Sequence, residues 1–355
     1  MDSCIPDIRD QEIAAMRILY IGQLREGQTA LERMKVLKRL GCTIVPFDVS
    51  SFANGVSRPL RSIAGRFNMG PILRNINRAL TNQTGSLRDV ERIWVDKGTW
   101  IYPETLKCLK QVTGGQVVHY TPDPQMCFHR SRHFISSIPL YDALVTTKEW
   151  EVEAYKKAGA KRVILTHQGY DSRFYPRTVG EPERSSFDSD VCFIGHPERH
   201  YAQRLKALSF LNIRLRIWGN GWPRYSYTHP WAKALVGEGL WGETYPRALA
   251  CSKIGLGLLS KWVPETATTR TFEIPAMGTF LLAERTSLHQ ELFEEGKEAD
   301  FFSSDEEMQD KTRFYLANQE ARQKIAAAGR ARCERSGYSS ANLMSKIIRE
   351  ISDDL

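Results

Sequence analysis

Two carboxylates with an arginine between them stand in the segment Pro264–Glu298, in a pattern that suits a charged ligand rich in hydroxyl groups. Glu265 and Glu273 are eight positions apart, and Arg270 lies between them. An Arg guanidinium forms strong paired hydrogen bonds with phosphate oxygens, and carboxylates accept hydrogen bonds from neutral hydroxyls. A ligand with both phosphate and sugar hydroxyls, a nucleotide sugar, matches this chemistry.

The residues around this arginine predict a short helix that positions it. A helix from about Thr269 to Met277 places Arg270 in the first turn, and a helix N-terminus beside an arginine attracts anions. Pro275 lies about one turn into the helix, where the missing N–H of proline removes only a single hydrogen bond. Gly278 is expected to end the helix. Thr279–Ala283 then reads as a buried strand. Candidate N-cap residues are Thr266, Thr268, Thr269 and Thr271.

The same segment resembles the C-terminal half of glycosyltransferases of the CgeB (spore-maturation) type. The resemblance rests on R-T-F-E-I-P-A-x-G-x-F-L-L from Arg270, followed by E-L-F-x-x-G-K-E, F-Y-L-A-N and I-A-x-x-G in that order. That family belongs to the group-1 glycosyl transferases, which have the GT-B fold. The resemblance implies an α/β protein of two Rossmann-like domains whose parallel sheets face each other across an interdomain cleft.

The spacing of the two carboxylates is also similar to the Glu-x(7)-Glu signature of retaining GT-B enzymes. This resemblance implies that Glu265 faces the donor sugar and that Glu273 holds the ribose hydroxyls, with Thr271 beside them. The alternative is that Glu265 is a solvated loop residue and Glu273 an ordinary helix residue. We favour the functional interpretation because both residues lie in or beside the longer pattern.

Composition places the chain among cytoplasmic globular proteins. It has 355 residues, 42% of them hydrophobic and 25% charged, and no apolar run approaches the length of a membrane span. No apolar signal-peptide region is visible near the N-terminus. Seven scattered Cys without a C-x-x-C pair favour reduced thiols over a disulfide framework or a zinc site. No metal is expected.

A basic stretch stands out against this background. Between Asp48 and Asp89 the chain has six arginines and no acidic residue. Such a stretch can meet nucleic acid, anionic lipid or a phosphorylated substrate, or it is simply a solvated face. Apolar residues are interleaved with the arginines of Arg58–Arg88, which allows an amphipathic surface helix and peripheral contact with the inner face of the membrane. No RNA-binding aromatic motif accompanies them, so nucleic acid is not expected as a partner.

The first half of the chain opens as a strand, loop, helix and strand over Met16–Gly22, Thr29–Leu40 and Cys42–Phe47, a Rossmann-like unit. Its loop fails as a P-loop because Gln28 stands where the phosphate-reaching Lys belongs. Further on, the strand Gln116–Tyr120 runs into a Pro-flanked turn.

Ligands gather at the carboxyl ends of strands in open α/β sheets, so His119 and Asp123 are the acid/base or acceptor-contact candidates of this half. The alternative is that Asp123 only shapes the turn, and His119 is weighted slightly toward a structural role.

The second half restarts the strand–glycine–helix pattern at Asp190–Gly195. Here the family resemblance implies diphosphate contacts at Gly195 and Arg199. It also implies a tight Gly219–Gly221 loop, where glycines let the backbone approach the nucleotide base. The segment Gly169–Pro176 resembles the G-x-D-x-x-F-x-P motif that closes the first domain of the family. We expect a leader at 1–15, an acceptor domain at 16–176, a linker at 177–189, a donor domain at 190–337, and a terminal helix at 338–355 that packs back on the first domain.

These residues and the resemblance imply a glycosyltransferase that takes a nucleotide-diphosphate sugar and uses no metal or other cofactor, with a lean toward retention of configuration. A non-catalytic protein on the same scaffold and a nucleotide-sugar epimerase remain the alternatives. The acceptor stays open between a protein, a glycan and a lipid-linked glycan. The donor base, the sugar, the general base and the oligomeric state are not predicted.

Overall fold

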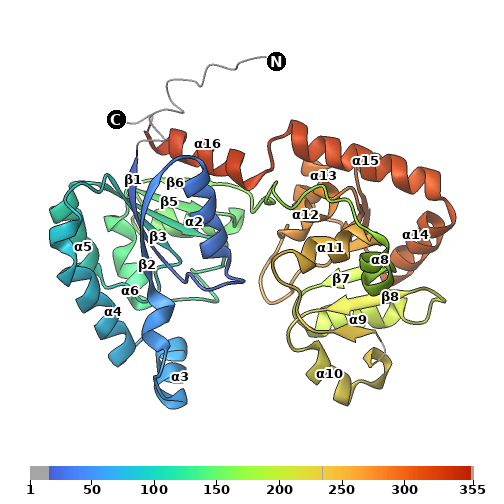
Figure 1. The fold of residues 1–355 in the computed structure, drawn as a ribbon, viewed down its shortest axis with the longest axis horizontal. Coiled ribbons are helices and arrows are strands. Elements are labelled where there is room, and N and C mark those ends of the chain that lie inside the picture. Colours follow the sequence, from blue (N-terminus) through green and yellow to red (C-terminus); the bar gives the residue numbers. More distant parts are fainter. Residues whose placement is uncertain (1–15, 234, 353–355) are drawn as a thin grey trace. The chain divides into compact units, whose positions relative to one another are not determined.

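The computed structural model describes residues 16–233 and 235–352, so the leader expected at 1–15 lies outside the described residues. The chain divides into two compact units. The first runs to His167 and takes up the chain again from Ala341, and the second spans Gln168–Ser340. Each unit is built around its own six-stranded parallel sheet (Figure 1). The expected α/β class is confirmed.

The first sheet has the strand order β2-β1-β3-β4-β5-β6. Its central strand β1 has Ile21 level with Phe47 of β2 on one side and Val95 of β3 on the other. Helices cover both faces of the sheet, which is why its central strands are continuous apolar runs. The strands are β1 (Arg17–Gly22), β2 (Thr43–Asp48), β3 (Arg92–Asp96), β4 (Gln116–Thr121), β5 (Ala143–Thr146) and β6 (Val163–Leu165).

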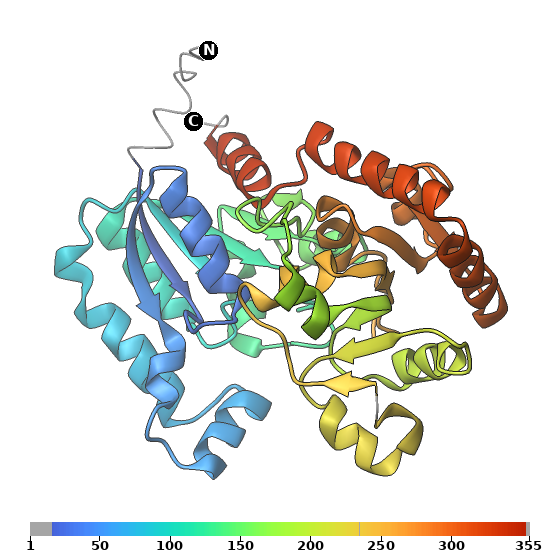
Figure 2. The same cartoon turned by 45° about the vertical axis from the view of Figure 1, so that its right-hand side comes forward.

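Two hydrophobic cores flank this first sheet. One is formed with α4, α5, α6 and α7, and the other with α2 and α16. The last helix, red in Figure 2, returns to this unit. It buries Met344, Ile347, Ile348 and Ile351. The helices of the unit, with short 3₁₀ turns written η, are α2 (Thr29–Arg39), η1 (Val49–Ala53), α3 (Arg58–Phe67), α4 (Pro71–Asn82), η2 (Thr84–Ser86), α5 (Pro103–Thr113), α6 (Arg132–Ser137), η3 (Ile138–Leu140), η4 (Glu149–Glu151), α7 (Val152–Lys157) and α16 (Ser340–Ser352).

The second sheet has the order β12-β11-β10-β7-β8-β9, so the chain starts in the middle, builds outward to β9, and then returns to add β10 on the other side of β7. The topological switch point of this sheet therefore lies between β7 and β10. In its register Ile254 of β10 is level with Val191 of β7 and with Phe280 of β11. The strands are β7 (Ser189–Ile194), β8 (Leu215–Trp218), β9 (Val236–Gly237), β10 (Ser252–Gly257), β11 (Phe280–Glu284) and β12 (Asp300–Phe302).

Helices again cover both faces of the second sheet. One core is formed with α11, α12 and α13 and the other with α9 and α14, while α15 contributes to both. The helices are α8 (Glu181–Phe187), α9 (Arg199–Leu208), α10 (Trp222–Thr228), η5 (Pro230–Ala232), α11 (Thr244–Ala250), α12 (Arg270–Ala276), α13 (Ser287–Leu292), α14 (Asp305–Ala317) and α15 (Gln319–Arg335).

Two segments differ from the sequence expectation. Residues 177–189, expected to be a linker, contain the helix α8 and belong to the second unit. Glu183 holds this helix, because its carboxylate accepts from the Gly180 N–H at its start and pairs with Arg177 and Arg247. The basic stretch forms two helices, α3 and α4, that are separated by a turn at Asn68–Gly70.

Candidate functional site

Arg270 lies at the switch point of the second sheet. Its Nη1 donates to the carbonyl oxygen of Ile194, at the end of β7, over 3.2 Å, and its Nη2 donates to that of Leu258, just after β10, over 2.7 Å. The guanidinium also lies over the rings of Phe193 and Tyr201, at 5.1 and 5.9 Å from their centroids. The carboxyl ends of the two strands that flank the switch point are thus joined by one cation.

This guanidinium keeps hydrogen-bonding capacity. The buried Nε of Arg270 and the buried Oγ1 of Thr268 have no hydrogen-bond partner among the described residues. Buried polar atoms are nearly always paired in folded proteins, so the Thr268 hydroxyl at the start of this helix is a candidate contact for a polar ligand. The Nε atoms of Arg177, Arg204 and Arg216 are buried without a hydrogen-bond partner in the same way, so the Arg270 Nε does not by itself mark a site. The helix α12 has only seven residues, and we therefore assign the positive charge of this place to the Arg270 side chain rather than to the helix end.

Glycines let two strand-end turns approach each other beside this arginine. A Cβ at Gly195 would lie 3.0 Å from Arg270 Nη1 and 2.9 Å from the Phe193 ring. A Cβ at Gly219, where φ is +154°, would collide with the carbonyl oxygen of Gly195. That carbonyl instead accepts a 2.7 Å hydrogen bond from the indole Nε1 of Trp222. Gly221 has a φ of +98° and packs against Pro197.

Glu273 is the acid of the pattern with the strongest perturbation. Its Oε2 accepts a 2.6 Å hydrogen bond from the Tyr245 hydroxyl. Burial raises the pKa of Glu273 to about 7, although Tyr245, Arg270 and Thr269 all favour its ionised form. A carboxyl group that titrates near neutrality beside an arginine is typical of functional sites.

Thr271 faces the interior. Its Oγ1 accepts from the Thr268 N–H and lies 2.9 Å from Nε2 of the buried His289. Nδ1 of His289 donates to the Glu284 carbonyl over 2.7 Å, so Nε2 of the neutral ring accepts from the Thr271 hydroxyl. Burial lowers the pKa of His289 to about 4, which keeps the ring neutral. The predicted threonine N-cap of α12 is not formed, because the N-cap residue Thr269 makes no such bond.

Glu265 lies in the loop between β10 and α12, and its side chain is partly exposed. Burial raises the pKa of the Tyr201 hydroxyl to about 12, with Glu198 and Glu265 contributing in the same direction and Arg270 opposing them. The charges of Glu265 and Arg270 therefore act on the same tyrosine. Arg199 is the first residue of α9 and is exposed.

Sequence reasoning missed a second set of polar groups at the same edge of the sheet. Glu284 ends β11 with a buried carboxylate, which accepts from the Leu259 N–H and pairs with His200 at 3.0 Å and Lys261 at 2.6 Å. Burial raises the pKa of Glu284, but these partners outweigh it and leave the pKa below its ordinary value. Nearby, Ser260 donates to the Glu198 carboxylate over 2.9 Å. These residues belong to no motif and meet only through the fold.

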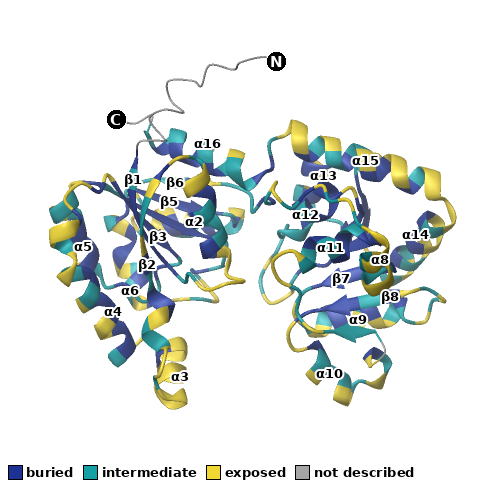
Figure 3. Ribbon diagram, in the orientation of Figure 1, coloured by how far each residue is buried: buried dark blue, intermediate teal, exposed yellow. Residues whose placement is uncertain are grey.

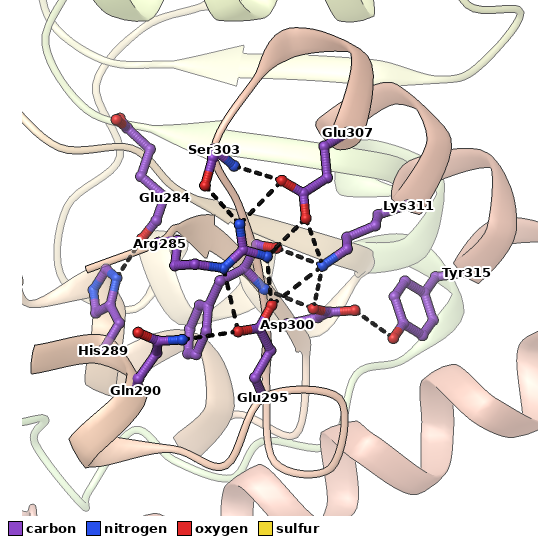
Figure 4. Close-up of polar contacts among 11 residues, drawn as sticks. Glu284, Arg285, His289, Gln290, Glu295, Asp300, Ser303, Glu307, Lys311 and Tyr315 are labelled. Atoms are coloured by element: carbon purple, nitrogen blue, oxygen red, sulfur yellow. Dashed lines mark hydrogen bonds and ion pairs between the residues drawn. The ribbon is translucent and has the colours of Figure 1, made fainter. Parts of the chain in front are cut away.

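Arg285, the residue after Glu284, stabilises this edge of the sheet through a network of ion pairs. Arg285 pairs with Glu295 and with Glu307, and its guanidinium also donates to Ser303 and to the Phe301 carbonyl (Figure 4). Lys311 joins the same network through Glu295, Glu307 and Asp300, and Tyr315 donates to Asp300. The network fastens β11 to β12 and to α14.

In the first unit, Asp123 follows β4 and pairs with Lys97 at 2.7 Å. Partial burial raises the pKa of Asp123, but Lys97 outweighs it and leaves the pKa below its ordinary value. His119 is fully buried, and its Nε2 donates to the Lys97 carbonyl over 3.2 Å. Burial lowers its pKa to about 4. His119 thus supports Lys97, whose φ is +66°, and its buried ring does not suit the predicted acid/base role.

The fold brings Gly195, Arg270 and the Gly219–Gly221 turn together in the second unit. The charge of Arg270 acts on Glu273, and the charges of Arg270 and Glu265 act on the same tyrosine, Tyr201. The fold assigns Asp123 and His119 to the first unit. Within residues 16–233 and 235–352, no group of three or more His, Cys, Asp or Glu side chains is arranged to hold a metal ion.

Comparison with known proteins adds a family match in this second half. Residues 199–349 match a family model described as glycosyl transferase-like. No sequence among curated proteins matches the chain.

Solved structures resemble nearly the whole chain. Anabaena HepE, determined in complex with UDP and glucose, superimposes with a TM-score of 0.65 at 12% identity, covering 96% of this chain and 100% of that one. Sucrose-phosphate synthase from Thermosynechococcus elongatus gives 0.64 at 12% identity with the same coverage. The chain has the GT-B fold. A putative UDP-N-acetylglucosamine 2-epimerase from Listeria monocytogenes gives 0.55 at 13% identity and 96% coverage of each chain.

Proposed function

We propose that this protein is a glycosyltransferase whose donor is a nucleotide-diphosphate sugar held at the switch point of the second sheet. The observation that carries the proposal is Arg270, a cation held at the switch point by its hydrogen bonds to the carbonyls at the ends of β7 and β10. Ligands of doubly wound sheets bind outside the carboxyl ends of the strands at this point. The match of residues 199–349 to a glycosyl transferase-like family supports the same conclusion.

The predicted residues other than His119 and Thr271 have a role in this proposal. Arg270, with Arg199 on α9, pairs with the diphosphate, and the Gly195 and Gly219 turns let the backbone approach the nucleotide. Glu273, held by Tyr245, accepts from the ribose hydroxyls, and Glu265 faces the donor sugar. Anabaena HepE, whose structure contains UDP and glucose, has the same fold, which supports a donor of this class.

In the transfer step, the bond between the anomeric carbon and the diphosphate oxygen breaks as the acceptor hydroxyl oxygen forms its bond to that carbon. Negative charge develops on the departing diphosphate, where a fixed guanidinium stabilises it most. We propose that the acceptor's proton passes to this diphosphate, that the anomeric configuration is retained, and that no metal takes part. Asp123, with its partner Lys97, is our candidate for contact with the acceptor.

A nucleotide-sugar epimerase is the second candidate, because an epimerase-titled structure shares the fold at a TM-score of 0.55. The two activities differ in their product. A transferase releases the nucleoside diphosphate and passes the sugar to an acceptor or to water, whereas an epimerase returns an isomerised sugar. A non-catalytic protein would do neither, and it would have no use for the motif that contains both Arg270 and Glu273.

The test is to incubate the protein with UDP-, GDP-, TDP- and CDP-sugars and to measure nucleoside diphosphate release and sugar isomers, with and without a chelator. We expect release from one donor class, unchanged by the chelator and lowered at least tenfold in Arg270→Met. Arg313→Met, on the exposed side of α14, serves as the matched control and should retain the wild-type rate. An isomerised sugar without release would establish the epimerase, and inertness toward all donors would contradict both enzymatic proposals.

A further inference from the structure

The positive charge of this chain is concentrated in two segments of the first unit. The chain has 49 basic and 41 acidic residues. Residues 49–88 and 124–141 together contain eight arginines and no lysine or acidic residue. The rest of the chain therefore has equal numbers of basic and acidic residues, and the whole formal charge of +8 belongs to these two segments.

None of these eight arginines forms an ion pair with a described residue. Most arginines elsewhere in the described chain do pair, as Arg33 does with Asp96 and Arg285 with Glu307. The unpaired set comprises Arg58, Arg61, Arg66, Arg74, Arg78, Arg88, Arg130 and Arg132, and all eight are exposed. Their charge is thus available to a partner.

The helix α3 adds an exposed apolar stripe to this charge. Only Ala64 of its ten residues is buried. Leu60, Ile63 and Phe67 are 38%, 37% and 60% exposed, and Met69 just beyond the helix is 56% exposed. The spacing of Leu60, Ile63 and Phe67 sets them on one side of the helix, while the arginines of α3 fall outside that stripe. Figure 3 shows α3 as a largely exposed helix, in contrast to the buried strands of its unit.

The end of this helix is fixed to the second basic segment. Asn68 takes a left-handed conformation with a φ of +49°. Its Nδ2 donates to the Arg130 carbonyl over 3.3 Å, and its own carbonyl accepts from His133 Nε2 over 3.1 Å. The loop before His133 exposes Phe128 by 52%, together with Arg130 and Arg132. Apolar and basic side chains from both segments therefore share one neighbourhood.

We propose that the surface formed by α3, the Asn68–Gly70 turn and residues 127–132 rests on a lipid bilayer that contains anionic phospholipids. Its arginines pair with headgroup phosphates, and Phe67, Met69 and the stripe of α3 enter the boundary between headgroups and acyl chains. A bilayer binds both the arginines and the exposed apolar side chains, whereas a nucleic acid would bind the arginines and leave the apolar stripe in water. No helix among the described residues has the length and hydropathy needed to cross a membrane.

This proposal is independent of the proposed transferase activity, so the two can fail separately. The test is co-sedimentation of the full chain with vesicles of phosphatidylcholine alone and of equal parts phosphatidylcholine and phosphatidylglycerol. We expect binding to the mixed vesicles only, weakened by salt. Each surface arginine raises the affinity for anionic vesicles about fivefold. The affinity of the triple variant R58Q/R61Q/R66Q for the mixed vesicles should therefore be lower by on the order of a hundredfold.

A second variant separates the apolar contribution from the charge. Phe67→Ser with Met69→Ser should weaken binding to the mixed vesicles at least tenfold without changing the charge. Phe210→Ser is the matched control, because Phe210 is 75% exposed on the second unit and should not affect binding. All of these side chains are exposed, and a thermal melt checks that each variant folds.

Three results would overturn the proposal. The first is that the wild type does not bind mixed vesicles, and the second is that the wild type and the triple variant bind them equally. The third is that the wild type binds an RNA oligonucleotide but not vesicles, and that the triple variant loses the RNA binding. The last result would assign the surface to nucleic acid instead.

Discussion

The Tyr245 hydroxyl donates a 2.6 Å hydrogen bond to the Glu273 carboxylate, and so joins α11 to α12 beneath the proposed donor site. The bond favours the ionised carboxylate, yet burial still raises the pKa of Glu273 to about 7. Near pH 7 the Glu273 carboxyl group is therefore about half ionised. In the proposed function this group accepts hydrogen bonds from the ribose hydroxyls. This position has consequences for both stability and binding.

Stability should fall as pH rises through the titration range of Glu273. The unfolded carboxyl titrates near 4.5 and the folded one near 7, so between these values the folded state binds more protons and each pH increase favours unfolding. Glu273→Gln removes the titration. Its free energy of unfolding should equal that of the wild type near pH 4.5 and exceed it by about 3 kcal/mol at pH 8. Urea unfolding across this range measures the difference.

Tyr245→Phe serves as the companion variant for that experiment. Without the hydroxyl, the pKa of Glu273 should rise further, so the decline in stability should extend to higher pH. A constant difference between Glu273→Gln and the wild type at all pH values would contradict the assigned titration.

The contact between Gly219 and Gly195 predicts a strong response to one methyl group. Gly219→Ala directs its Cβ into the Gly195 carbonyl oxygen, so we expect a loss of about 3 kcal/mol or more of unfolding free energy. Gly242→Ala is the control, because that position has a φ of +54° but open space. The unfolding free energy of Gly242→Ala should fall by only about 1 kcal/mol, because the added Cβ strains the backbone without a collision. Equal losses in the two variants would show that the close approach is not formed.

Arg270 should not be replaceable by Lys, although the charge is kept. A guanidinium reaches the Ile194 and Leu258 carbonyls together, whereas an ammonium group cannot reproduce that planar geometry. We expect Arg270→Lys to lose about 2 kcal/mol of stability and at least tenfold in affinity for the donor nucleotide. Calorimetric titration of the nucleoside diphosphate, together with a thermal melt, measures both. Wild-type affinity in this variant would reduce the role of Arg270 to a point charge.

The network around Arg285 predicts sensitivity to acid. Its hydrogen bonds lower the pKa of Glu307 to about 2, against an ordinary value of 4.5. Stability from this group is present above pH 4.5 and is lost as the pH falls toward 2. Glu307→Gln should therefore be less stable than the wild type at pH 6, by about 1–2 kcal/mol after allowance for its partial exposure, and this difference should shrink by about half at pH 3. Urea unfolding at both pH values tests this, and a difference that is as large at pH 3 as at pH 6 would contradict it.

Much of the fold could be predicted because apolar runs ended by glycine mark the buried strands of a parallel sheet. The expected helix around Arg270 spans Arg270–Ala276, and Gly278 follows it with a φ of +79°. The expected strands Gln116–Tyr120 and Asp190–Gly195 correspond within one residue at each end to β4 (Gln116–Thr121) and β7 (Ser189–Ile194). By contrast, β12 has three residues and α10 is rich in aromatic residues without an apolar period, so neither had a pattern to detect.

The site was less predictable, because its contacts join residues that are distant in sequence. Tyr245 and Glu273 are 28 positions apart, and His200 and Glu284 are 84 apart. Such pairs depend on strand order, which places β10 beside β7 and which no local pattern specifies. His119 remained a candidate beside its structural alternative for the same reason, since the end of a strand does not reveal whether a side chain points into the core, where the fold places it.

The central claim is that Arg270 and Glu273 hold a nucleotide-diphosphate sugar, and a thermal-shift panel of UDP-, GDP-, TDP- and CDP-sugars tests it most directly. A donor at a hundred times its dissociation constant should raise the melting temperature of the wild type by about 3 °C or more. The same donor should leave Arg270→Met and Glu273→Ala unshifted while still shifting the Arg313→Met control. A melting temperature that no donor moves, or one that moves equally in all four proteins, would contradict the account.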